Sequence, residues 1–201
     1  MRFTPEKCCP RCHAPRALCY CALLPVIDSD TRVSIIVHRS EFCRATATAN
    51  TAHLCLPNSR VFPYGRAEES FDMEALLSIP GNALYLFPEP YAETLDVTLA
   101  TAIPRPIHLI VPDGSWAQAK RIHRRVPALH AIRIVQLPPQ GVSRYQLRYA
   151  HEEHQLCTLE AIAAALGVIE GAAIQQGLQG ALEIQVERMK GKRPRFTNRA
   201  E

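Results

Sequence analysis

Four cysteines in the N-terminal stretch CPRCHAPRALCYC (residues 9–21) have the spacing of metal ligands. Cys9 and Cys12 form a C-x2-C pair, and Cys19 and Cys21 form a C-x-C pair. Four thiolates on a short loop can close a tetrahedral site around Zn²⁺, a metal that suits sulfur ligands and imposes no geometry of its own. The pattern predicts a structural zinc site. Two alternatives stay open: reduced cysteines without metal, and a ligand set shifted by one residue to include Cys8.

The start of the chain bears on the compartment. MRFTPEKCC lacks the apolar core of a signal peptide, and no apolar run approaches the ~18 residues that cross a bilayer. We therefore expect a cytoplasmic protein with no membrane partner, in which thiols stay reduced and a disulfide framework is disfavoured. The remaining cysteines, Cys43, Cys55 and Cys157, stand alone in apolar patterns and are expected to be small core residues.

Positive charge is concentrated in two places. The formal net charge is only +4, but KRIHRR (120–125) and the tail MKGKRPRFTNR (189–199) each gather several cations. Such clusters fit a polyanion such as RNA, whose phosphates dominate binding affinity. The alternative is a solvated helix face and a frayed terminus.

The elements that would position these groups alternate in type. Apolar, β-branched runs predict strands, and the patterns between or after them predict helices. The strand runs are 33–37, 83–87, 107–111 and 131–137, and the candidate helices are 44–55, 71–78, 115–125, 157–167 and 171–189. Near-continuous apolar strands that alternate with helices predict an α/β fold with a parallel sheet covered on both faces. The turn DSDTR (28–32) divides a small zinc-binding segment (1–29) from one main domain (30–201).

Ligands of such sheets lie beyond the carboxyl ends of the strands, so the residues after each run carry the functional hypotheses. His38, Arg39 and Glu41 follow the first run, and Pro88 and Glu89 the second. The third run ends in PDGSW (112–116), where an Asp-Gly turn precedes a helix that Ser115 can cap. On local chemistry alone, Asp113 and Ser115 could be capping residues and Trp116 a core anchor.

Four separated stretches resemble one family. CPRCHAPRALCYC, HRSEFCRATATANTAHL, DGSWAQAK and SRYQLRYAHEEHQLCTLEA occur in the order found in the DTW-domain family, the tRNA-uridine aminocarboxypropyltransferases. Ser115 stands where the D-x-T-W signature usually has Thr; both carry a hydroxyl, so we expect the role to be kept. YAHEEHQ, between Arg148 and Leu156, differs from the family pattern.

The resemblance implies an activity, a cofactor and a fold. Family members transfer the 3-amino-3-carboxypropyl group of S-adenosylmethionine to N3 of a tRNA uridine and release methylthioadenosine. Their fold is SPOUT-like, which implies a C-terminal trefoil knot around the cofactor in addition to the parallel sheet. The partner is then tRNA, while monomer and oligomer stay open.

The expected roles follow from this chemistry. Uridine N3 becomes nucleophilic as its proton leaves, and Asp113 is the expected general base. Arg148 could pair with the methionine carboxylate in bidentate fashion. The expected cofactor contacts are Phe87, Pro88, Val111, Asp113, Gly114, Ser115, Trp116, Tyr145, Leu147, Arg148 and Thr158. The expected RNA contacts are His38, Arg39, Glu41, Arg44, Lys120, Arg124, Arg144, Lys192, Arg193 and Arg195.

Two other functions remain as alternatives. A SPOUT-type RNA methyltransferase would share the cofactor and the basic surface but release S-adenosylhomocysteine. A non-catalytic zinc-containing RNA-binding protein would not bind S-adenosylmethionine at all.

Overall fold

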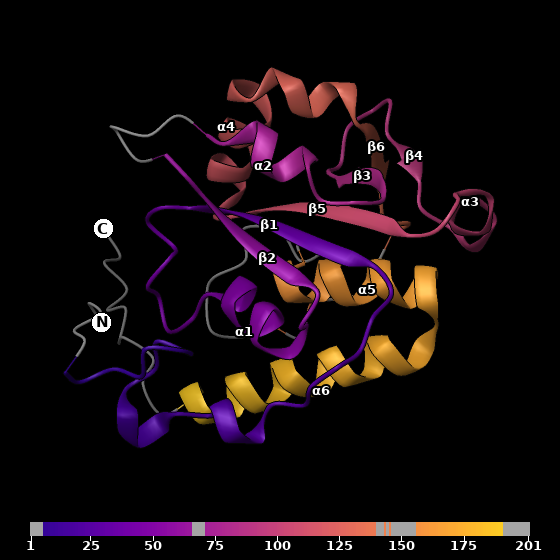
Figure 1. Cartoon of the computed structure of the whole chain (residues 1–201). Helices are drawn as coiled ribbons and strands as arrows, with labels where there is room; N and C mark the ends of the chain where they lie inside the picture. Colours follow the sequence, from indigo (N-terminus) through magenta and orange to yellow (C-terminus); the bar gives the residue numbers. More distant parts are fainter. Residues whose placement is uncertain (1–5, 66–70, 140–142, 144, 146–155, 191–201) are drawn as a thin grey trace, which may run out of the picture.

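The computed structural model describes residues 6–65, 71–139, 143, 145 and 156–190, and within them the chain forms one six-stranded sheet (Figure 1). The strands are β1 (Arg32–His38), β2 (Ser59–Tyr64), β3 (Asn82–Leu86), β4 (Glu93–Thr94), β5 (Ile107–Asp113) and β6 (Arg133–Gln136). Their order across the sheet is β2-β1-β5-β3-β6-β4, and every recorded pairing is parallel. The predicted parallel α/β sheet is therefore confirmed.

Helices cover both faces of this sheet, as predicted (Figure 1). They are α1 (Thr48–Cys55), α2 (Met73–Leu77), α3 (Val97–Ala102), α4 (Trp116–Arg125), α5 (Thr158–Glu170) and α6 (Ala172–Met189), with short 3-10 turns at Arg16–Leu18, Cys21–Leu23 and Pro127–Ala131. Helices α1, α5 and α6 lie on one face and α2 and α4 on the other.

Side chains that alternate along the strands contribute to a hydrophobic core on each face of the sheet. In β5, Leu109 and Val111 pack toward α1, α5 and α6, whereas Ile110 packs toward α4. Successive side chains of a strand point to opposite faces, so a strand covered on both sides is apolar at nearly every position. That is why 107–111 and 33–37 read as continuous apolar runs in the sequence.

Three elements were not predicted. Strand β2 is an edge strand of mixed burial that contains Pro63, a residue that edge strands tolerate because one side of their backbone pairs with no neighbour. Strand β4 has 2 residues and α3 has 6, too few for a periodic signal. The predicted helix at 157–167 continues past Gly167 and ends at Glu170, before Gly171 with its φ of 109°.

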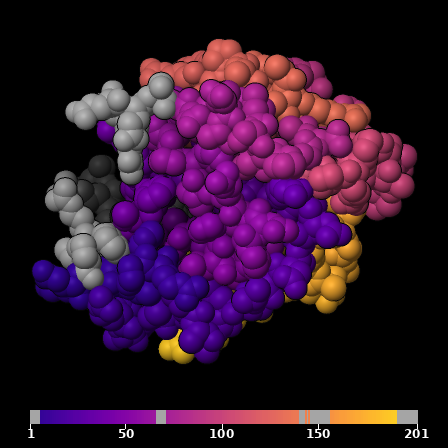
Figure 2. Space-filling model, viewed as in Figure 1, coloured from indigo at the N-terminus to yellow at the C-terminus, as the bar shows by residue number. Residues whose placement is uncertain are grey.

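The N-terminal segment, residues 6–29, packs against the main body, along the side seen in indigo in Figure 2. The fully buried Tyr20 lies against the end of α6, and its hydroxyl is 3.1 Å from Thr51 Oγ1 of α1. Because Thr51 donates its proton to Gln185 Oε1 of α6 at 2.9 Å, Tyr20 must be the donor to Thr51. This chain of hydrogen bonds fixes the segment to two helices of the main domain.

The DSDTR turn is also anchored. Glu170, at the end of α5, accepts hydrogen bonds from Ser29 Oγ and from the backbone N–H groups of Asp30 and Thr31.

The division of the chain at residues 29 and 30 stays a prediction, as do the SPOUT-like class and the trefoil knot. In the described part of the chain, no helix combines the length and the hydropathy that a membrane span needs.

Candidate functional site

A cavity of about 790 Å³ lies at the carboxyl edge of the sheet, and we call it the strand-end cavity. Its wall comes from the β1–α1 loop, the ends of β3, β5 and β6, and the start of α5. All the expected cofactor contacts that the structure describes line it: Phe87, Pro88, Val111, Asp113, Gly114, Ser115, Trp116, Tyr145 and Thr158. Leu147 and Arg148 lie outside the described residues. The structure thus brings the predicted set together, while its binding role stays a prediction.

Asp113 is the last residue of β5 and lines this cavity although the residue is only 5% exposed. Thr158, the first residue of α5, donates a hydrogen bond from Oγ1 to Asp113 Oδ1 at 2.5 Å. A hydroxyl that donates to a carboxylate makes a short, charge-assisted bond. Thr158 therefore holds the Asp113 carboxylate in one orientation at the cavity wall.

In the turn after Asp113, the backbone of Gly114 lies close to the side chain of Gln118. Gly114 has a φ of 152°, and a Cβ there would lie 2.9 Å from the Gln118 side chain. Ser115 then caps α4, because its Oγ accepts from the Gln118 N–H while Gln118 Oε1 accepts from the Ser115 N–H at 2.6 Å. This capping box leaves Trp116 half-buried on the first helical turn, where it lines the cavity instead of anchoring the core.

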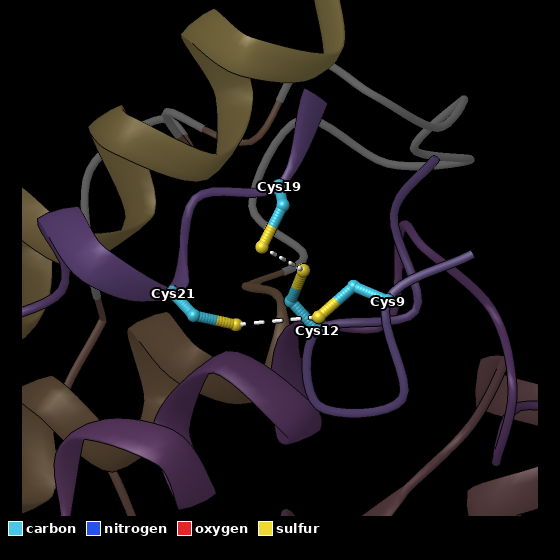
Figure 3. A group of neighbouring side chains, drawn as sticks. All are labelled: Cys9, Cys12, Cys19 and Cys21. Atoms are coloured by element: carbon cyan, nitrogen blue, oxygen red, sulfur yellow. Dashed lines mark hydrogen bonds between the residues drawn. The ribbon is translucent and has the colours of Figure 1, made fainter. Parts of the chain in front are cut away.

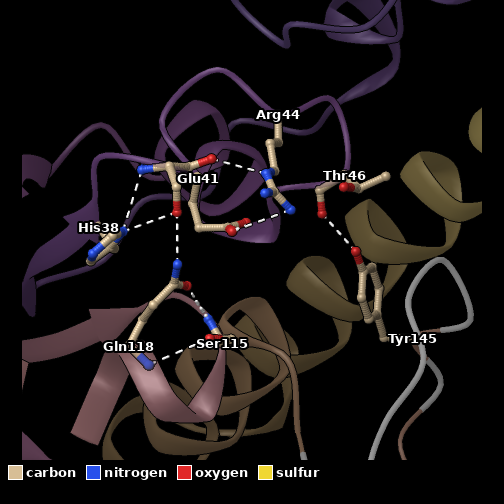
Figure 4. Close-up of polar contacts among 8 residues, drawn as sticks. His38, Glu41, Arg44, Thr46, Ser115, Gln118 and Tyr145 are labelled. Carbon is tan, nitrogen blue, oxygen red and sulfur yellow. Dashed lines mark hydrogen bonds and ion pairs between the residues drawn. The ribbon is translucent and has the colours of Figure 1, made fainter. Parts of the chain in front are cut away.

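Gln118 also ties two strand-end loops together (Figure 4). Its Nε2 donates to Ser40 Oγ at 2.7 Å, and Ser40 lies in the loop that follows β1. The Ser40 backbone N–H points at His38 Nδ1 at 3.3 Å, and Ser40 Oγ is 3.0 Å from the same nitrogen. Desolvation, together with the cations Arg121 and Arg39, lowers the pKa of His38. His38 is therefore neutral near pH 7, with Nδ1 as the acceptor.

The β1–α1 loop is fixed at two further points. Glu41 is buried, and its Oε1 lies 3.4 Å from Arg44 Nη1, while Arg44 Nε donates to the Ser40 carbonyl. Tyr145 donates its hydroxyl proton to the Thr46 carbonyl at 2.6 Å (Figure 4). Glu41 thus differs from the other expected RNA contacts, because it is buried and its carboxylate forms an ion pair with Arg44.

The expected RNA contacts lie on two elements beside the strand-end cavity. Arg39 and Arg44 are exposed on the β1–α1 loop, and Lys120 and Arg124 are exposed on α4. Lys120 and Arg124 are four residues apart on that helix, so they share one face. Arg144, Lys192, Arg193 and Arg195 lie outside the described residues.

Several cavity residues were not predicted. Gln136 ends β6 and residues 137–139 follow it, while Thr46 precedes α1 and Thr48 begins it. The rule that pointed to the ends of the other strands also applies to β6, so Gln136 and Pro138 could have been found from the sequence. Thr46 and Thr48 had no local signal, because only the fold places the β1–α1 loop against β5.

The four predicted metal ligands form one cluster (Figure 3). The Sγ atoms of Cys9 and Cys21 are 3.7 Å apart, those of Cys12 and Cys19 are 3.8 Å apart, and all four lie within 4.8 Å of one another. A tetrahedral ion with Zn–S bonds of about 2.3 Å needs S···S separations of about 3.8 Å. The thiols fit such an ion, and the cluster uses Cys9 rather than Cys8.

Local backbone geometry supports this cluster. Burial raises the pKa of Cys12 and Cys21, whereas at Cys9 hydrogen bonds from the backbone N–H groups of Cys12 and Arg11 and from the Cys19 and Cys21 thiols outweigh burial and lower the pKa to about 6. A thiolate is the form that binds metal. His13, with a φ of 58°, closes the turn, and its N–H donates to the Cys9 carbonyl at 3.0 Å.

The expectation for the other cysteines is only partly met. Cys55 is buried and Cys157 half-buried, but Cys43 is exposed on the β1–α1 loop, so the prediction of a core position for Cys43 is wrong. The loop leaves the sheet after His38, and its residues no longer alternate between two covered faces.

Comparisons with known proteins agree with these motifs. The DTW domain matches residues 6–190. A curated relative, tRNA-uridine aminocarboxypropyltransferase 2 of Mus musculus, is 32% identical over 81% of this chain and 56% of its own length. The protein of the same name from Drosophila melanogaster is 32% identical over 81% of this chain and 66% of its own length. The chain thus spans about three fifths of these relatives.

A solved structure supports the fold. The SAM-dependent rRNA:acp-transferase Tsr3 from Vulcanisaeta distributa superimposes with a TM-score of 0.52 at 18% identity and covers 79% of this chain and 77% of its own. The family match covers both the cysteine cluster and the Asp113 turn. The chain therefore belongs to the DTW domain family.

Proposed function

We propose that this chain is a tRNA-uridine aminocarboxypropyltransferase that transfers the 3-amino-3-carboxypropyl group of S-adenosylmethionine to N3 of a tRNA uridine. Family membership and the names of the curated relatives support this reaction. The observation that carries it is the placement of Asp113, a carboxylate held by Thr158 in the wall of the strand-end cavity.

The strand-end cavity fits the proposed substrates. Its volume of about 790 Å³ lies in the upper part of the range for small-molecule sites, and its wall is largely apolar with a few polar groups. Trp116 and Phe87 offer aromatic surface, whereas Ser115 and Thr158 offer hydroxyl groups. S-adenosylmethionine supplies a sulfonium, which makes methylthioadenosine a good leaving group when N3 attacks the propyl carbon.

The residues of the chain have separate tasks in this reaction. Asp113 accepts the N3 proton as the N–C bond forms and the C–S electron pair moves to sulfur. Thr158 keeps the accepting carboxylate oriented, and the capping box at Ser115 fixes the turn that carries it. Regiochemistry is then a matter of positioning, because the protein decides which carbon meets the nucleophile.

We further propose that Cys9, Cys12, Cys19 and Cys21 hold a structural Zn²⁺ ion. The tetrahedral fit of the four thiols supports this assignment. All four ligands come from the protein, so the ion would have no open position for catalysis. Its task is to fix the N-terminal segment against α1 and α6.

The test of the reaction is product analysis. Purified protein is incubated with S-adenosylmethionine and tRNA that lacks the modification, and both the nucleosides and the small-molecule product are measured by mass spectrometry. We expect methylthioadenosine and a uridine heavier by one aminocarboxypropyl group. Release of S-adenosylhomocysteine would indicate a methyltransferase instead. No S-adenosylmethionine binding in calorimetry would leave a non-catalytic RNA-binding protein.

A further inference from the structure

A second cavity, of about 320 Å³, lies between the N-terminal segment and the main body. Arg11 and His13 line it from the cysteine-bearing segment, Phe42 and Ala47 from the β1–α1 loop, and Asn50 and His53 from α1. The wall also contains the buried Glu41, whose carboxylate is paired with Arg44. None of these residues takes part in the reaction proposed above. The second cavity exists only because the N-terminal segment packs on α1, since neither part alone provides both walls.

The two cavities are neighbours across one loop. Ala47 lines both of them, while Thr46 lines the strand-end cavity and Phe42 the second one. The loop between them is held in place by Tyr145 at Thr46 and by Gln118 at Ser40. A flexible ligand with one unit in the strand-end cavity could therefore place the adjoining unit in the second.

The chemistry of the second cavity suits a nucleobase with its phosphates. Phe42 is 37% exposed and lines the cavity wall, so its aromatic ring is accessible from outside the core. Three exposed cations accompany it: Arg11 on the cavity wall, and Arg39 and Arg44 on the same loop. Single-stranded RNA is bound by this combination, because bases stack on aromatic rings while cations contact the backbone.

Two polar side chains in the wall are oriented by bonds of their own. Asn50 Nδ2 donates to the Arg11 carbonyl at 2.7 Å, which fixes the carboxamide. His53 Nδ1 is 2.8 Å from Ser59 Oγ, which fixes the ring. Carboxamide and imidazole groups form hydrogen bonds with the edges of bases. Because Asn50 and His53 are held in place beside the Phe42 ring, the cavity suits a base better than an acidic peptide.

We propose that the second cavity binds one nucleobase of the substrate RNA, the one adjacent to the acceptor uridine, with Phe42 stacked on it. Its volume, at the low end of the range for small-molecule sites, suits a single base. Arg11, Arg39 and Arg44 contact the flanking phosphates. This site rests on the proposed function in one respect, that the substrate is RNA.

The first test measures the binding of unfractionated tRNA by fluorescence anisotropy across a salt series. Phe42→Ala should weaken binding about tenfold, which corresponds to about 1.4 kcal/mol and lies within the range for one stacked base. The slope of affinity against salt should not change, because no cation is removed. Phe42→Tyr should bind as the wild type does. Wild-type affinity of Phe42→Ala would overturn the proposal.

A matched control comes from the opposite edge of the sheet. Val97, at the start of α3, is 67% exposed and belongs to an element that precedes the amino end of β5 (Figure 1). Val97→Ala should leave tRNA binding unchanged, and equal weakening by Val97→Ala and Phe42→Ala would also count against the site. Thermal unfolding and S-adenosylmethionine binding of all variants show whether the fold and the strand-end cavity are intact.

Cross-linking locates the base directly. A tRNA transcript that contains 4-thiouridine is irradiated with the full-length protein, and the cross-linked peptides are identified by mass spectrometry. We expect cross-links in the peptide that contains Phe42 or in the one that contains Arg11 and His13. Cross-links confined to other peptides would overturn the site.

Neither readout requires group transfer, so the two proposals can fail separately. If no methylthioadenosine forms but the binding of tRNA still depends on Phe42, the reaction is wrong and the site stands. If transfer occurs and Phe42→Ala binds tRNA as the wild type does, the site is wrong and the reaction stands.

Discussion

Thr158 Oγ1 donates a hydrogen bond to Asp113 Oδ1 at 2.5 Å, across 45 positions of the chain. The bond joins the carboxyl end of β5 to the first residue of α5. Asp113 ends a buried strand and lines the strand-end cavity. The bond from Thr158 fixes the orientation of its carboxylate in the cavity wall.

This contact gives the first prediction. Asp113→Asn should lower kcat by about 10²-fold or more, the usual scale for the loss of a general base, with little change in S-adenosylmethionine affinity. Thr158→Val, which removes only the hydroxyl, should lower kcat by a smaller factor, and Thr158→Ser should restore most of it. Steady-state kinetics that separate kcat from KM check both. An unchanged kcat for Asp113→Asn would remove this residue from the mechanism.

A second prediction separates the two bonds of the Gln118 side chain. Ser40→Ala removes the acceptor of the Gln118 amide and keeps the capping box, whereas Gln118→Ala loses both bonds. Both variants should lower kcat/KM several-fold, because the β1–α1 loop loses its tie to α4. Only Gln118→Ala should also lower Tm, by about 2–4 °C for the loss of one hydrogen bond worth about 1 kcal/mol, because the Ser115 N–H loses its acceptor. Wild-type kinetics in both variants would show that the tie has no role in catalysis.

A third prediction concerns the cysteine cluster. Protein purified without chelators should carry about one equivalent of zinc, measured by mass spectrometry of the metal. Cys19→Ser should lose the metal and destabilise the N-terminal segment, since structural zinc contributes folding free energy. The exposed Cys43 is the matched control, because Cys43→Ser should keep both metal and stability. Metal content near zero in the wild type would contradict the assignment.

A fourth prediction is a loss of stability in acid. Burial, and to a lesser extent the Arg32 cation, lowers the pKa of His108 to about 4, and His108 Nε2 lies 2.7 Å from Ser34 Oγ inside the sheet. Between pH 6.5 and 4 the unfolded chain binds a proton that the native state does not. The free energy of unfolding therefore falls as the pH falls through this window, by about 3 kcal/mol at most from this group.

Denaturant unfolding at several pH values measures this effect. His108→Gln keeps a group that can bond to Ser34 but does not titrate, so its stability should depend less steeply on pH between 6.5 and 4. Parallel curves for the two proteins would show that His108 does not carry the effect.

Much of this protein follows from sequence alone because the signals are local. A C-x2-C pair and a C-x-C pair need only a short loop to converge, and the runs at 33–37 and 107–111 reflect strands that are buried on both faces. The DGSW turn is likewise specified by neighbouring residues, since Gly114 permits the close approach and Ser115 caps the helix. The edge strand β2 was not predicted, because its residues are partly exposed and do not form an apolar run.

Tertiary structure alone decided which of these local features meet. The order β2-β1-β5-β3-β6-β4 places β1 beside β5, and that adjacency lets Gln118 reach Ser40. The packing of α5 brings Thr158 to Asp113, and the packing of the N-terminal segment on α1 creates the second cavity. These contacts depend on how buried surfaces fit between elements that are distant in the chain, and no spacing of residues in the sequence records that fit.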